Sequence, residues 1–174
     1  MSQTKKITLS AMMVALGTAF MIVGALVEVL DLTVCALASL PLVFIYLEIG
    51  SYYPWLVWIC TTLTTFLLYS GSPIWAEYFL VFGIYPLIKA YIERLPKWTW
   101  LIIKILYINV VIWALFFICE LLLGVSFFGE DTFGMKVAVY LLMNVAFVAF
   151  DFFITVMVRF YYDKLRPRFR KMLK

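Results

Sequence analysis

The stretch from Ile7 to Val27, which reads ITLSAMMVALGTAFMIVGALV, is the segment around which the chain is organised. As an α-helix it would reach about 31 Å, close to the ~30 Å hydrocarbon core of a bilayer. Ala11, Ala15 and Ala19 recur every four residues within it. They therefore share one helix face that another helix can approach closely. The stretch predicts a membrane-spanning helix whose small residues form a docking surface or a packing seam.

The composition of the whole chain predicts an integral membrane protein. Of its 174 residues, 66% are hydrophobic and 14% are charged, which leaves too little polar surface to cover a water-soluble globule. Short connections containing glycine or proline separate the apolar segments and predict antiparallel neighbours. We therefore expect an all-α, six-transmembrane-helix bundle forming one domain over residues 1–174, with a basic tail at 161–174. The predicted spans are 7–27, 32–48, 55–69, 74–92, 98–123 and 137–160.

The distribution of basic residues predicts the orientation of this bundle. Lys and Arg beside membrane spans are retained on the cytoplasmic side. Basic residues precede the first span, surround the turn between the fourth and fifth spans, and follow the last span. We expect a multi-pass protein of the cell (plasma) membrane with both termini in the cytoplasm. The tail suits an anionic lipid surface rather than nucleic acid, because Pro167 would interrupt a long basic recognition helix.

The opposite side of the predicted bundle carries a group of acidic and aromatic residues near the ends of four helices. Carboxylates combined with aromatic faces suit a cationic or heteroaromatic small molecule. The alternative is that acidic residues collect there because basic ones are excluded. Glu77 and Glu120 are the favoured ligand residues, since both lie inside helical stretches. The predicted substrate-binding residues are Glu28, Asp31, Trp75, Glu77, Tyr78 and Glu120.

Asp151 lies well inside the sixth predicted span, and Lys104 and Lys89 lie at comparable depth on the fifth and fourth. A charge within the hydrocarbon layer is costly unless it is paired or hydrated. We therefore predict an intramembrane ion pair between Asp151 and one of these lysines. The pair either pins the helix packing or takes part in a proton or conformational relay.

Enzymatic signatures are absent from the sequence. The chain has no histidine, and its three cysteines lie in apolar stretches without metal-ligand spacing. It has no phosphate-binding loop, no nucleophile elbow and no zinc-protease motif. We expect no catalytic residue, no metal site and no cofactor in this chain. Any energised work would draw on a partner or on an ion gradient.

The segment KITLSAMMVAL, residues 6–16, resembles the start of substrate-binding S components of energy-coupling factor (ECF) vitamin transporters. This resemblance implies an S-component-like fold that captures a vitamin or similar small molecule at its outer face. It also implies docking, through an Ala-x3-Ala motif on the first helix, onto a transmembrane coupling subunit driven by two ATPases. Ala11 and Ala15 match that motif, and ATP would enter only through these partner subunits.

The leading hypothesis is therefore the membrane-embedded substrate-binding subunit of an ECF-type uptake transporter. In it, Ala11 and Ala15 dock the partner, whereas Ala19, nearer mid-membrane, packs within the bundle. One alternative is a non-transporting membrane scaffold of the same fold in a larger membrane complex, which the short first and third connections favour. Another is an ion-coupled small transporter that uses Asp151, Lys104 and Lys89.

Overall fold

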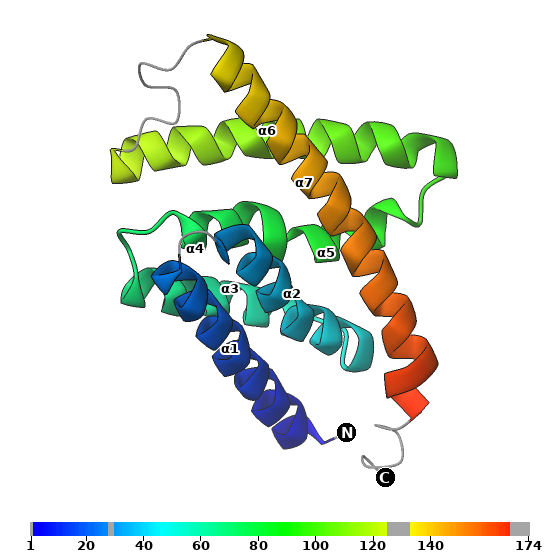
Figure 1. Ribbon diagram of the computed structural model, residues 1–174. Coiled ribbons are helices and arrows are strands. Elements are labelled where there is room, and N and C mark those ends of the chain that lie inside the picture. The colour runs from blue at the N-terminus through cyan, green and yellow to red at the C-terminus, as the bar shows by residue number, and fades with distance from the viewer. Residues whose placement is uncertain (1, 28–29, 125–132, 168–174) are drawn as a thin grey trace. The chain divides into compact units, whose positions relative to one another are not determined.

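A computed structural model describes residues 2–27, 30–124 and 133–167 of the chain, and all regular secondary structure within these ranges is helical (Figure 1). The elements are α1 (Gln3–Leu26), α2 (Asp31–Glu48), α3 (Tyr53–Leu68), α4 (Ile74–Glu77), the π-helix η2 (Tyr78–Gly83), α5 (Tyr85–Ile92), α6 (Lys97–Leu123), α7 (Phe133–Phe160) and the π-helix η3 (Tyr161–Leu165).

Each of the six predicted apolar segments is helical in the structure. The fourth segment, residues 74–92, is formed by α4, η2 and α5 in succession. Four helices are long and apolar enough to cross a membrane: α1, α2, α6, and α7 together with η3. This is consistent with a membrane protein. The crossing of α3, which is shorter, and of the α4–η2–α5 segment stays a prediction.

The ends of the helices follow from local backbone chemistry. The Oγ of Ser2 accepts a hydrogen bond from the backbone N–H of Lys5 and so caps the start of α1. Gly50, after α2, and Gly124, after α6, have φ angles of 61° and 64°. This left-handed conformation is nearly free of cost for glycine and ends a helix. Pro54 occupies the first turn of α3, where no hydrogen bond is lost.

The chain divides into two compact units, Met1–Glu130 and Asp131–Lys174. The first contains α1 to α6, and the second contains α7 and η3. The arrangement of all six segments as one bundle stays a prediction. In the second unit, η3 extends the last helix to Leu165, so the start of the basic tail is helical. The end of the predicted tail, residues 168–174, lies outside the described residues.

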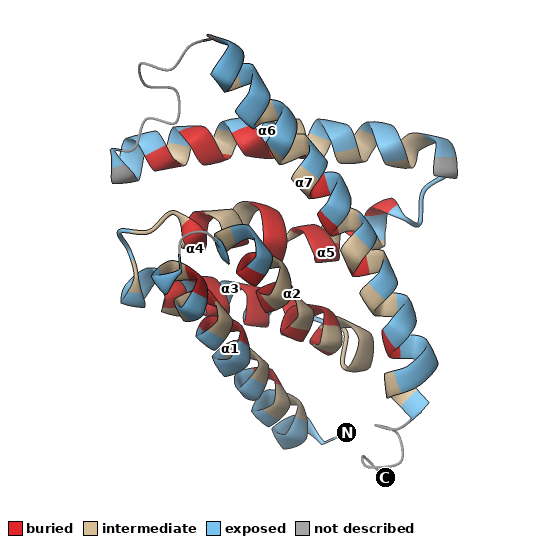
Figure 2. Cartoon of the chain, viewed as in Figure 1, coloured by how far each residue is buried: buried red, intermediate tan, exposed pale blue. Residues whose placement is uncertain are grey.

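In the first unit, α1 packs against α2 and α3 through a face of small and polar residues. A Cβ added at Gly24 would lie 2.6 Å from Cδ1 of Ile74, and one at Gly17 would lie 3.2 Å from Cγ2 of Thr61. Both glycines therefore allow close helix approach. Figure 2 shows the buried positions of α1 on one side of the helix only. These buried residues are Ser10, Gly17, Thr18, Met21 and Gly24.

In the core of the first unit, the α4–η2–α5 segment packs against α2, α3 and α6. The ring of Trp58 on α3 stacks on Phe79 of η2 at a centroid distance of 4.8 Å, and its Nε1–H donates to the Phe79 carbonyl at 3.2 Å. On the other side, Leu115 and Cys119 of α6 pack with Ala76 of α4. These contacts place the start of the α4–η2–α5 segment between α2, α3 and α6.

Candidate functional site

Two acidic residues lie where helices begin. Asp31 is the first residue of α2, and Glu77 lies in the first turn that follows Pro73. The positive end of a helix dipole favours a carboxylate at both positions. The Oε2 atom of Glu77 is enclosed by protein and has no hydrogen-bond partner among the described residues. Oδ1 of Asp31 is likewise enclosed. Such positions place negative charge inside apolar surroundings, where a cation or a proton is needed to balance it.

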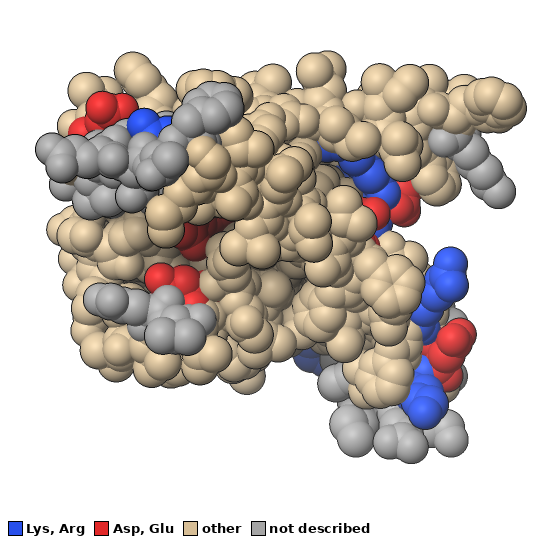
Figure 3. Space-filling view, turned by 45° about the horizontal axis from the view of Figure 1, so that its top comes forward, with Lys and Arg blue, Asp and Glu red and all other residues tan. Residues whose placement is uncertain are grey.

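The two carboxylates belong to one cluster that joins α2, α4 and α6. Asp31 lies close enough to Glu77 for the two carboxylates to repel each other electrostatically, and both interact electrostatically with the Cys35 thiol of α2. Glu77 also interacts electrostatically with the Cys119 thiol of α6. The Cys35 thiol contacts Met21 Sδ at 3.9 Å. Figure 3 shows acidic side chains recessed among residues that carry no charge. We call Asp31, Glu77, Cys35 and Cys119 the acidic cluster.

The two aromatic residues predicted to bind the substrate, Trp75 and Tyr78, pack against other parts of the first unit. Trp75 is partly buried, meets the ring of Phe66 edge-on at 5.0 Å, and donates its Nε1–H to the Ser70 carbonyl at 3.3 Å. Tyr78 is fully buried, and its hydroxyl points to the Ala38 carbonyl at 3.5 Å. Tyr78 therefore lies in the core of the first unit, and its part in substrate binding stays a prediction.

Two further acidic residues were predicted to bind the substrate, Glu120 and Glu28. Glu120 is exposed on α6, and no described interaction joins it to Glu77. Its neighbour Cys119 is buried and lies within electrostatic range of Glu77. The part of Glu120 in substrate binding stays a prediction. Glu28 lies outside the described residues. The cysteines were missed as members of the cluster because their apolar surroundings indicated only buried thiols. Among the described residues, no group of three potential ligands is placed to hold a metal ion.

The small-residue ladder of α1 faces away from the rest of the first unit. Ala11, Ala15 and Ala19 are all exposed, whereas Gly17 and Gly24 make the close contacts. Ala19 makes no close contact of this kind within the first unit, so its packing within a complete bundle stays a prediction. The helix has two small-residue faces, and the glycines, which permit the closest approach, form the internal one.

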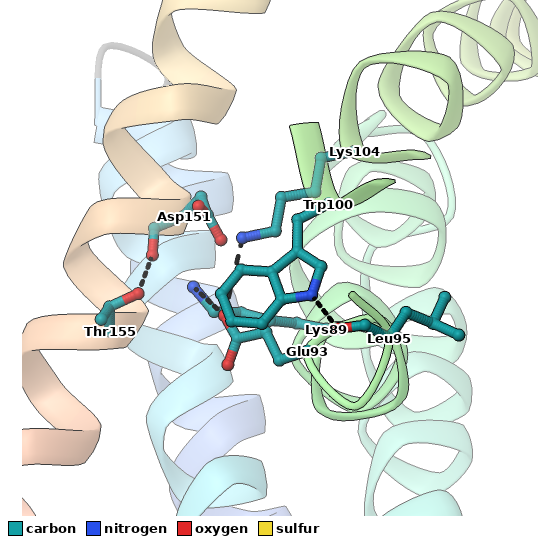
Figure 4. Close-up of polar contacts among 7 residues, drawn as sticks. All are labelled: Lys89, Glu93, Leu95, Trp100, Lys104, Asp151 and Thr155. Atoms are coloured by element: carbon teal, nitrogen blue, oxygen red, sulfur yellow. Dashed lines mark hydrogen bonds and ion pairs between the residues drawn. The ribbon is translucent and has the colours of Figure 1, made fainter. Parts of the chain in front are cut away.

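Lys89, which is buried, and Lys104, which is partly buried, meet a carboxylate that the sequence analysis did not select. Nζ of Lys89 and Nζ of Lys104 each lie 3.5 Å from the same oxygen, Oε1 of Glu93 (Figure 4). Glu93 follows Lys89 by four residues, which is the spacing of neighbours on a helix surface and the signal that could have identified it.

Asp151 belongs to the second unit, so its predicted pairing with Lys89 or Lys104 stays a prediction. Within that unit, the hydroxyl of Thr155 donates to the backbone carbonyl of Asp151 at 2.9 Å. This hydrogen bond joins residues one helical turn apart on α7 and involves the backbone of Asp151, not its carboxylate.

Comparison with protein-family models, with characterised proteins and with solved structures gives no match to this chain. Its function is therefore inferred from its own residues.

Proposed function

We propose that the chain is the membrane-embedded substrate-binding subunit of an ECF-type uptake transporter for a vitamin or similar small molecule. The observation that carries this proposal is the division of α1 into two faces. Its glycine face is occupied by α2 and α3, whereas Ala11 and Ala15 are exposed and present a smooth surface. A surface of this kind suits a close-packed partner helix, such as that of a transmembrane coupling subunit.

The docking proposal is tested by enlarging the exposed alanines. We expect Ala11→Trp and Ala15→Trp to abolish co-purification of a coupling subunit after gentle detergent extraction, because an indole ring prevents close helix approach. Leu16→Trp is the matched control, since Leu16 is 45% exposed on the same helix and lies about 100° or more around the helix axis from Ala11 and Ala15. Undiminished association in the Ala15→Trp variant would refute docking through this face.

The acidic cluster is the proposed ligand site. Two enclosed carboxylates within electrostatic range of each other favour a ligand that brings positive charge. The described residues that touch the cluster are largely apolar, among them Met21 and Ala76. A small organic cation with an apolar body would satisfy both features. The ligand would then enter near the start of α2, at the predicted outer face.

The second prediction concerns Glu77. A panel of water-soluble vitamins and small organic cations is expected to contain a compound that raises the melting temperature of the purified protein. Glu77→Gln should weaken its binding about tenfold or more, since a charge-assisted contact is lost. The same change should raise the melting temperature of the ligand-free protein, because it removes repulsion with Asp31.

Glu120→Gln is the control for that measurement, because Glu120 is exposed and lies outside the acidic cluster. Equal ligand affinity in both variants would exclude Glu77 from the site. A panel without any stabilising compound would favour the second candidate, a non-transporting scaffold of the same fold. The short connection from Tyr69 to Pro73, which leaves little chain to close over a substrate, supports that alternative.

A further inference from the structure

The segment that carries Glu77 changes its helical register directly after that residue. Ile74–Glu77 is α-helical, Tyr78–Gly83 forms the π-helix η2, and α5 begins at Tyr85. In a π-helix each N–H donates to the carbonyl five residues earlier rather than four, so the turn holds an extra residue. Compared with a continuous α-helix, the residues before such a turn are rotated by about 100° relative to those after it. The register of η2 therefore decides in which direction Glu77 points relative to α5.

Two side chains from neighbouring helices donate hydrogen bonds to consecutive carbonyls of η2. Nε1–H of Trp58 on α3 donates to the Phe79 carbonyl at 3.2 Å. The hydroxyl of Tyr107 on α6 donates to the Leu80 carbonyl at 2.7 Å. Neither hydrogen bond belongs to the backbone ladder of the helix. Because π-helical turns are rare and compete with the commoner α-helical register, these two bonds stabilise the register in which both carbonyls face their donors.

Ring contacts hold the two donors in place. The indole of Trp58 stacks on the ring of Phe79 with an interplanar angle of 11°. The ring of Tyr107 lies 5.6 Å from that of Tyr85, the first residue of α5. Pro86, which follows Tyr85, has no N–H to donate to the preceding turn. The backbone ladder thus lacks a hydrogen bond where η2 meets α5, and side chains from α3 and α6 support this junction.

We propose that Trp58 and Tyr107 are positioning residues for the Glu77 carboxylate. They hold η2 in the π-helical register and thereby keep Glu77 within electrostatic range of Asp31, in the acidic cluster. Their effect passes through the backbone carbonyls of η2 rather than through a contact with a ligand. This inference rests on the proposed function, because it assigns the two residues a part in the ligand site of that proposal.

The test compares melting temperatures of the full-length protein without any ligand. Glu77→Gln is expected to raise the melting temperature of the unmodified protein, because it removes the repulsion with Asp31. In proteins that already carry Tyr107→Phe or Trp58→Phe, we expect about half of this increase or less, since η2 can then leave the π-helical register and turn Glu77 away from Asp31. Tyr107→Phe removes only the hydroxyl, and Trp58→Phe retains a ring that can stack.

Thr65→Val is the matched control, because it removes a buried hydroxyl whose hydrogen bond, to the Thr61 carbonyl at 2.8 Å, stays within α3. The control should retain the full increase, since a general loss of stability does not change the repulsion within the acidic cluster. Equal increases in the Tyr107→Phe, Trp58→Phe and Thr65→Val proteins, whether full or reduced, would overturn the positioning role and leave the ligand site standing. If Glu77→Gln did not raise the melting temperature of the unmodified protein, both the acidic cluster as a ligand site and its positioning would be overturned.

Discussion

Replacement of Gly83 with alanine is expected to lower the free energy of unfolding by about 3 kcal/mol, the upper part of the range for overpacked cores. A Cβ at this position would lie 2.5 Å from Cδ1 of Trp58 and 2.8 Å from the carbonyl oxygen of Tyr78. The first atom belongs to a stacked indole, and the second belongs to the backbone of η2. Neither can move without disturbing the contact between α3 and η2.

Reversible denaturation in mixed detergent micelles, followed by tryptophan fluorescence, measures this effect. Gly71→Ala is the matched control, because a Cβ at Gly71 would meet nothing within 4 Å. Its unfolding free energy should stay within about 0.5 kcal/mol of that of the unmodified protein. If Gly83→Ala proved as stable as Gly71→Ala, the close approach of η2 to Trp58 would be refuted.

The second large effect is expected at Glu93. Glu93→Gln should lower the free energy of unfolding by about 2 kcal/mol, because it leaves two lysines without their shared carboxylate. This value lies below that of a fully buried pair, since the Glu93 side chain is 36% exposed. Its position at the end of α5 gives a small offset, because a carboxylate there opposes the helix dipole.

A double substitution separates lost pairing from lost packing. Lys89→Gln combined with Glu93→Gln should recover part of the stability, because one of the two lysines that shared the carboxylate is removed with it, and only Lys104 then loses its contact with Glu93. Glu120→Gln, an exposed carboxylate on α6, serves as the control for charge removal. Additive losses in the double variant, measured by the same denaturation, would show that Lys89 and Glu93 contribute independently of each other.

The acidic cluster shows how far sequence reasoning reaches at a site of this kind. Carboxylates in an apolar chain are conspicuous, so Asp31 and Glu77 were selected from the sequence, and the structure brings them together. Glu120 was selected by the same reasoning and is exposed, whereas its neighbour Cys119 is buried. Which of two successive residues is buried depends on the rotation of α6 about its own axis, since one residue along a helix turns the side chain by about 100°.

The sequence by itself determined where the helices form. Hydropathy and backbone preferences act over a few residues, and glycines follow α2 and α6, so the apolar helices α1, α2 and α6 are predictable locally. Only the tertiary structure decided which face of each helix is internal. On α1, both an alanine face and a glycine face suit close packing. The glycine face is the internal one, because Ile74 and Thr61 approach it so closely that a Cβ would interfere. Likewise, Glu93 became the partner of Lys104 only when α5 and α6 were brought side by side.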